Sequence, residues 1–155
     1  MTQAWISLGA CAGLLAVAGL ALVRVGRSVL ALPLSVLCIA LSTWNFADFA
    51  LAHSGGPGWR LMATAAALMS APSALHFILS FVGERRRLAA VMFSAYGVFG
   101  VLAATTMAGL GSARVAEAVS SRAFVLMVLT FAAPLLLGGL SLLTQHLRRE
   151  VRATE

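Results

Sequence analysis

The sequence predicts an all-α fold, a polytopic membrane bundle of five transmembrane helices. The first reason is composition: 61% of the 155 residues are hydrophobic, only 10% are charged, and the mean hydropathy is +0.96. Soluble domains average about 45–50% apolar and about 25% charged residues. The second reason is that the apolar residues gather in five stretches, each close to the ~20 residues with which a helix crosses a hydrocarbon core of about 30 Å. An ordinary water-soluble domain and a disordered chain are thereby excluded.

Each stretch is predicted to be a helix because a helix satisfies its own backbone hydrogen bonds in lipid. None shows the short alternating segments of an outer-membrane barrel. The first stretch has no Lys or Arg before Trp5 and is long for the apolar region of a signal peptide, so we expect a retained helix. The five predicted spans, in order along the chain, are residues 4–23, 29–52, 60–82, 89–110 and 123–144.

The connections between the predicted spans are short. Gly and Pro within residues 53–58 end the second span in a turn, and residues 83–88 form a tight turn before the fourth. Residues 111–122 make the longest connection, part of which we expect to be a surface helix. Short connections favour antiparallel neighbours. They leave no room for a separate extracellular domain, so any recognition is expected in the bundle or at its rims.

The chain divides into a transmembrane domain, residues 1–144, and a basic helical extension, residues 145–155. Leu147 and Val151 continue the apolar spacing of the fifth span, with polar and charged residues between them. This spacing is typical of an amphipathic helix that leaves the membrane. The extension either continues into a coiled coil or is a basic tail that sets the topology.

Arginine predicts the orientation of the spans. Eight Arg follow the first, third and fifth spans, whereas the other side of the bundle carries only Arg60, Arg114 and Arg122. The positive-inside rule places the side with eight in the cytoplasm. We therefore expect the N-terminus outside and the C-terminus inside, in a multi-pass protein of the inner (plasma) membrane. Such arginines next to a bilayer predict contact with anionic lipid head groups, and they lack the context of a nucleic-acid site.

Asp48 is the acidic residue placed well within a predicted span, about 6 Å from its outer end at 1.5 Å per residue. A charge at mid-membrane costs about 2.5–3.5 kcal/mol and less near the interface, so Asp48 should face the bundle. One interpretation is a sensing carboxylate in an outer site with Trp44, Asn45, Trp59 and Arg60. The alternative is a structural pair between Asp48 and Arg60, with the aromatic rings anchored at the interface.

Candidate packing and hinge positions lie elsewhere in the spans. His76 is about 18 Å deeper than Asp48 and is expected to be a hydrogen-bonded packing residue. Pro72 and Pro134 each remove a backbone hydrogen bond and predict kinks in the third and fifth spans. Gly9 and Gly13 form a GxxxG pattern, which permits close helix contact or a homodimer.

Motifs for catalysis are missing from the sequence. It contains no P-loop, no GxSxG elbow and no HExxH pattern, and no pair of carboxylates at a catalytic spacing. Cys11 and Cys38 belong to no metal-ligand spacing and are expected to be small packing residues. We expect no catalytic activity in this chain, no metal site and no cofactor.

The second and third spans carry a family resemblance. The residues that carry the resemblance are 44–48 (Trp-Asn-Phe-Ala-Asp), a short loop with Trp59, an Ala-Pro pair ending at Pro72, and residues 76–83 with the following arginines. They resemble the N-terminal region of bacterial sensor histidine kinases of the seven-transmembrane type. The resemblance covers about residues 30–105. It implies a signal-input module that passes a conformational change to a cytoplasmic kinase domain. This chain departs from the family in having five predicted spans and no kinase domain.

The leading hypothesis is therefore a non-catalytic membrane signal-input module, in which a stimulus at the outer half of the bundle is relayed through the last helix. It is then either a piece of a longer kinase or a stand-alone membrane protein. A small transporter or channel-like protein is the second hypothesis, although the inner halves of the spans offer few polar residues. A structural subunit of a larger membrane complex is the third.

Overall fold

The computed structural model describes residues 2–153, all of whose regular elements are helices. Five of the six helices are long and apolar enough to cross a membrane. The predicted all-α fold with five candidate membrane spans is thus confirmed. The helices are α1 (Thr2–Leu22), α2 (Ala31–Ser54), α3 (Pro57–Val82), α4 (Ala89–Ala108), α5 (Ala113–Val119) and α6 (Arg122–Ala153).

The turn predicted at residues 53–58 was too long. The helix α2 continues to Ser54, and Gly55 ends it with a left-handed φ of 64° and a backbone N–H that donates to the Leu51 carbonyl at 2.9 Å. Pro57 then starts α3, because proline at the first helical position gives up an N–H that has no partner there. Only two residues therefore separate α2 from α3.

The other connections follow the predictions more closely. The helix α4 ends at Ala108, two residues before the predicted end, and Gly109 donates its N–H back to the Thr106 carbonyl at 3.1 Å. The short helix α5 lies within the connection where a surface helix was expected. The helix α6 runs unbroken for 32 residues, so the fifth span and the extension as far as Ala153 form one helix.

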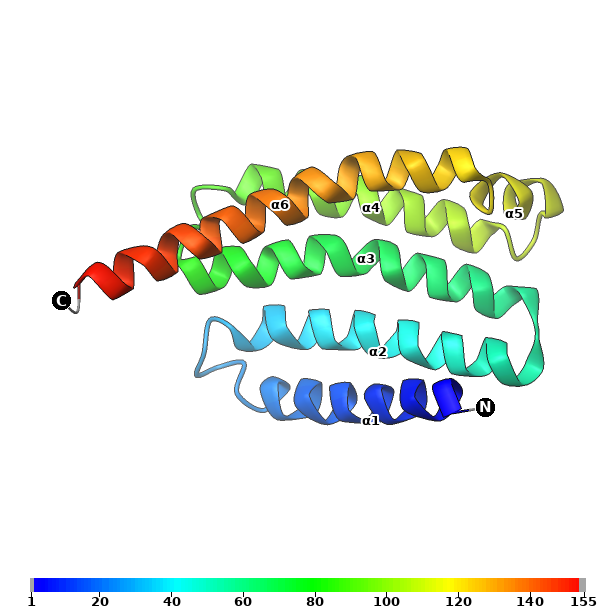
Figure 1. The fold of residues 1–155 in the computed structure, drawn as a ribbon, viewed down its shortest axis with the longest axis horizontal. Coiled ribbons are helices and arrows are strands. Elements are labelled where there is room, and N and C mark those ends of the chain that lie inside the picture. The colour runs from blue at the N-terminus through cyan, green and yellow to red at the C-terminus, as the bar shows by residue number, and fades with distance from the viewer. Residues whose placement is uncertain (1, 154–155) are drawn as a thin grey trace.

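Figure 1 shows α1, α2 and α3 side by side, with α4 and α6 beyond α3. The helix α3 packs against α2, α4 and α6, whereas α1 packs chiefly against α2. Half of the apolar window of α3 is buried, against 11% for α1 and for α6. The helix α3 is therefore the centre of the bundle, and α1 lies at its edge.

Two hydrophobic clusters hold α3 to its neighbours. Leu75 and Leu79 pack against Met92 of α4, with Leu135 and Leu142 of α6 at the margin. The second cluster, nearer the other end of α3, joins Leu68 and Ala71 to Phe99 of α4 and also involves side chains of α6. Side chains of α3, α4 and α6 therefore share one core.

The contact between α1 and α2 is built from small and weakly polar residues. The Cys11 sulfur and the Ser42 hydroxyl are 3.1 Å apart, and the same hydroxyl lies 3.1 Å from the Cys11 carbonyl, to which it donates. Ser35 donates to the Ala18 carbonyl at 3.3 Å across the same interface. Small side chains let two backbones approach closely. Both cysteines are buried and free, in agreement with their predicted packing role.

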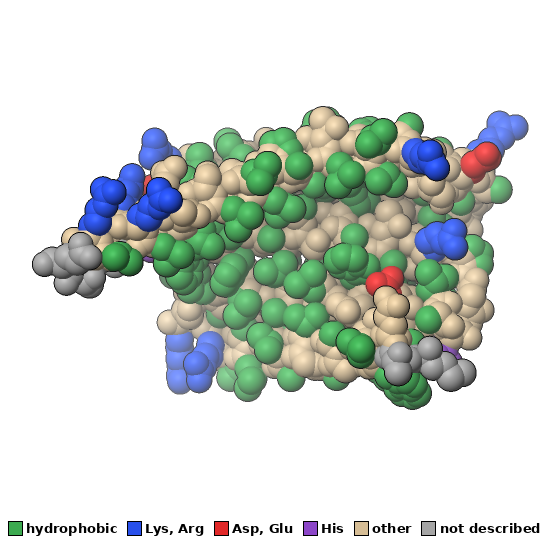
Figure 2. Space-filling view, viewed as in Figure 1, with side chains coloured by type: hydrophobic (Ala, Val, Ile, Leu, Met, Phe, Trp, Pro, Cys, Tyr) green, Lys and Arg blue, Asp and Glu red, His purple; other side chains and the backbone are tan. Residues whose placement is uncertain are grey.

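Charge is separated from the apolar middle of the bundle. In Figure 2, hydrophobic side chains cover the middle of the visible face, and arginine side chains gather at its two ends. The α1–α2 and α3–α4 connections and the end of α6 share one end of the bundle (Figure 1). These segments contain the eight arginines that the sequence analysis assigned to one side. We refer to this end as the arginine-rich end.

Candidate functional site

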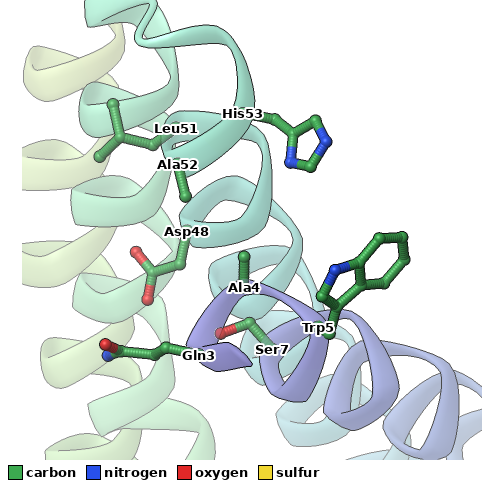
Figure 3. A pocket seen from close by; sticks show the side chains of 8 residues that line it. All are labelled: Gln3, Ala4, Trp5, Ser7, Asp48, Leu51, Ala52 and His53. Atoms are coloured by element: carbon green, nitrogen blue, oxygen red, sulfur yellow. The ribbon is translucent and has the colours of Figure 1, made fainter. Parts of the chain in front are cut away.

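A cavity of about 720 Å³ lies at the opposite end, between the beginning of α1 and the end of α2 (Figure 3). The interface of these helices is narrow because it is made of small residues, but near its end the side chains become larger and polar. The cavity is lined by Gln3, Ala4, Trp5 and Ser7 of α1 and by Asp48, Leu51, Ala52 and His53 of α2.

Polar groups gather on one side of this cavity. In Figure 3 the side chains of Gln3, Ser7 and Asp48 lie together on one side of the helix pair. Among residues 2–153 no hydrogen bond or ion pair engages the Asp48 carboxylate. An amide, a hydroxyl and an unpaired carboxylate thus offer hydrogen-bond acceptors and one negative charge to whatever enters.

Aromatic rings form the other side of the cavity. The Trp5 ring lies 5.9 Å from the Phe49 ring and 6.3 Å from the His53 imidazole, centroid to centroid. Phe49 and His53 stack at 4.9 Å with an interplanar angle of 30°. This stack restricts the rotamers of His53 and supports Trp5, which is itself 60% exposed. The cavity therefore combines one carboxylate with a supported indole ring.

The expected pair between Asp48 and Arg60 is not formed. The ion pair found in the described part of the chain joins Arg87 to Glu84 at 3.7 Å, at the other end of the bundle. Asp48 lies on the side of α2 that lines the α1 cavity, whereas Arg60 lies exposed in the first turn of α3. The rotation of α2 about its axis thus directs this carboxylate to α1.

The other predicted site residues do not line the cavity. Asn45 donates its Nδ2–H to the Leu41 carbonyl of its own helix at 2.8 Å. Trp59 packs edge-on against Phe46, with ring centroids 5.7 Å apart. Trp44 is half-exposed on α2, one helical turn deeper than Asp48. Of the five residues predicted for an outer site, the structure places Asp48 alone in the cavity.

Sequence reasoning missed Gln3, Trp5 and His53. All three lie within one or two turns of a helix end, as does Ser7, which also lines the cavity. Depth can be counted from the sequence at 1.5 Å per residue. The direction of a side chain around its helix cannot be counted in this way, and it decides which of these residues meet.

The deeper candidate positions have packing roles. His76 is buried, and its Nδ1 lies 3.3 Å from the Tyr96 hydroxyl, so it is hydrogen-bonded as predicted. Pro72 is fully buried in α3. Pro134 lines a cavity of about 460 Å³ between α4 and α6. Among residues 2–153 no atom of another helix lies within 4 Å of an ideal Cβ position at Gly9 or Gly13, so these two glycines face open space.

No group of three or more His, Cys, Asp and Glu side chains within residues 2–153 is arranged to hold a metal ion. No family model matches the chain, and no curated protein or solved structure shows significant similarity to it.

Proposed function

We propose that this chain is a multi-pass membrane protein that works as a non-catalytic signal-input module. A cationic ligand binds in the α1–α2 cavity, and the change in packing is relayed through α3 to α6. The observation that carries the proposal is a cavity with an unpaired carboxylate at one end of the bundle, opposite the C-terminal part of a 32-residue helix. Under the positive-inside rule the cavity end faces outward and the arginine-rich end faces the cytoplasm.

The chemistry of the cavity favours an organic cation. A carboxylate without a partner near a membrane interface is stabilised by binding a positive charge. An indole face adds a cation–π attraction of about 0.5–2 kcal/mol, depending on desolvation. Asp48 and Trp5 line the same cavity from two different helices. In Figure 3 Asp48 of α2 lies on the same side as Gln3 and Ser7 of α1, so a cation bound at the carboxylate is in reach of both helices.

The contacts between helices supply the path for the relay. The helix α2 packs against α3, and α3 packs against α6. At 1.5 Å per residue α6 is about 48 Å long, which exceeds a hydrocarbon core of about 30 Å by roughly 18 Å. Its end projects past the other helices in Figure 1. A tilt of α6 is therefore amplified at the end that leaves the bundle.

Transport is less well supported by the arrangement of polar groups. The hydroxyls of Ser35, Ser73 and Thr106 are buried, and each donates to a backbone carbonyl of its own helix. Such local hydrogen bonds satisfy the hydroxyls without forming a continuous polar path. The cavity near Asp48 lies at one end of the bundle, and the buried hydroxyls do not extend it as a polar path to the other end. This arrangement suits recognition of a ligand better than its transport.

Binding is tested with tetramethylammonium chloride as the probe and sodium chloride at equal ionic strength as the control. In a Trp44→Phe, Trp59→Phe background Trp5 is the remaining tryptophan, so its fluorescence reports on the cavity. We expect saturable quenching or enhancement that Asp48→Asn weakens at least about tenfold. Glu117→Gln removes an exposed carboxylate of α5 outside the cavity and should leave binding unchanged.

The relay is tested in the same protein with a pair of spin labels at positions 84 and 148. We expect tetramethylammonium to change the distance distribution between these labels, and Asp48→Asn to abolish the change. Absence of binding, or equal loss in Asp48→Asn and Glu117→Gln, overturns the assignment of the site. Binding without any change between the labels overturns the relay but leaves the site standing.

A further inference from the structure

A second cavity, of about 570 Å³, lies at the arginine-rich end, where α3 ends and α4 begins. It is bounded by the last turn of α3, the turn after Gly83, the first turns of α4 and Val29 of the α1–α2 connection. It belongs neither to the Asp48 cavity nor to the relay path from α2 through α3 to α6. We propose that it binds the phosphate of an anionic phospholipid, with the start of an acyl chain beside it.

A buried hydroxyl without a partner marks the polar part of this cavity. Ser80 is 9% exposed, and its Oγ has no hydrogen-bond partner in the structure. Most serines and threonines in these helices donate to a carbonyl three or four residues back, as Ser73 does to Met69 at 2.7 Å. A buried hydroxyl left unsatisfied costs about 1–3 kcal/mol. Ser80 lines the cavity, so a ligand oxygen is the partner that this hydroxyl lacks.

The charge around Ser80 is positive. Arg85 and Arg86 line the cavity, and neither is in an ion pair with a described residue. The nearest acidic residue along the chain, Glu84, pairs with Arg87 at 3.7 Å, and both of these residues line a different cavity. No acidic side chain among those that the structure describes lines the Ser80 cavity. Two guanidinium groups are therefore left for an anion, and guanidinium binds phosphate through parallel N–H donors.

The start of α4 adds donors at the same place. Its first residue, Ala89, lines the cavity, and the N-cap residue Leu88 offers no side-chain hydrogen bond to the free N–H groups. The first N–H groups of a helix have no intrahelical partner and attract anions. The uncapped start of this 20-residue helix thus favours an anion at the same place as Ser80, Arg85 and Arg86 do.

The apolar part of the cavity lining favours a lipid over a free anion. Val29, Met92 and Phe93 form the apolar lining, and Phe93 is 68% exposed. An inorganic phosphate uses none of this apolar surface, whereas the first methylenes of an acyl chain cover it. The cavity also lies at the end of the candidate spans, at the level where phospholipid head groups are found.

The test measures lipid binding by native mass spectrometry of the detergent-solubilised full chain. The probes are dioleoyl phosphatidylglycerol, dioleoyl phosphatidylcholine and inorganic phosphate. We expect phosphatidylglycerol to bind at least about tenfold more tightly than phosphatidylcholine, and inorganic phosphate to compete only weakly. Arg85→Gln with Arg86→Gln should weaken phosphatidylglycerol binding by about tenfold or more.

Two further variants separate the cavity from general charge. Ser80→Ala removes an unsatisfied buried hydroxyl, so the fold should be unharmed while phosphatidylglycerol binding falls about tenfold. Arg148→Gln with Arg152→Gln removes equal charge from α6 at the same end, outside the cavity, and should change binding less than twofold. Equal losses in the two double variants, no loss in Ser80→Ala, or tight binding of inorganic phosphate overturns the proposal.

Discussion

The packing of α6 on α3 is tested by two adjacent glycines of α6. A Cβ added at Gly139 would lie 3.2 Å from the Ile78 Cδ1 and 3.7 Å from the Leu75 Cδ1, both on α3. A Cβ added at Gly138 meets no atom within 4 Å. We therefore predict opposite outcomes for Gly139→Leu and Gly138→Leu, although both replace the same residue type in the same helix.

The expected difference in the free energy of unfolding follows from which effects the two variants share and which they do not. Replacing Gly by Leu in a helix interior favours folding by up to about 1 kcal/mol in both cases, so this contribution cancels in the comparison. Only at Gly139 does the new side chain push into a packed interface, which costs about 1–3 kcal/mol. Gly139→Leu should thus be less stable than Gly138→Leu by about 1–3 kcal/mol, roughly a 5- to 150-fold change in the unfolding equilibrium.

The assay is reversible unfolding in mixed micelles of mild detergent and dodecyl sulfate, followed by tryptophan fluorescence. Gly138→Leu should match or exceed the unaltered protein in its midpoint, and Gly139→Leu should fall below it. The spin-label distance between positions 84 and 148 should also change in Gly139→Leu without any ligand. Equal stability of the two variants would refute the rotation of α6 about its own axis that places Gly139, and not Gly138, against α3.

Two further predictions concern the surroundings of the bundle. Leu79 is fully buried, and Leu79→Ala should lower the free energy of unfolding by about 1–2 kcal/mol, because lipid is as apolar as the side chain and only the cost of the cavity remains. Leu20 is 71% exposed, so Leu20→Ala should leave the free energy of unfolding almost unchanged in the same micelle titration. A cost for Leu20→Ala near that for Leu79→Ala would contradict the assigned core. In intact cells an impermeant thiol reagent should label Ser54→Cys but not Glu84→Cys, and the reverse pattern would invert the proposed orientation.

The distances along each helix were predictable, and the directions around each helix were not. The sequence placed Asp48 near the outer end of its span, and Asp48 lines a cavity at that end of the helix. None of the partners that it considered for Asp48, Arg60 among them, lines this cavity, and it passed over Trp5 and His53. In a soluble helix an apolar stripe would reveal which face is buried. Here both faces are apolar, so composition does not show which residues meet the next helix.

The glycines likewise separate what the sequence could predict from what only the tertiary structure decided. Gly9 and Gly13 form the more recognisable motif, yet they face open space among residues 2–153. Gly139, which belongs to no such motif, lies against Ile78 of α3. Close approach of two helices depends on shape at the point of contact, and in lipid that packing supplies much of the association energy. A pattern of small residues therefore indicates where contact is permitted without indicating whether it occurs.

Composition and local periodicity by themselves determined the helical class, the five apolar helices, the continuous final helix and the gathering of eight arginines at one end. These properties depend on neighbours in the chain and on the length that lipid requires. The tertiary structure decided that α3 is central, that Asp48 lines a cavity between α1 and α2, and that Ser80 lines a second cavity with Arg85 and Arg86. These depend on how each helix is rotated against its neighbours, and that rotation is set by packing between residues distant in sequence.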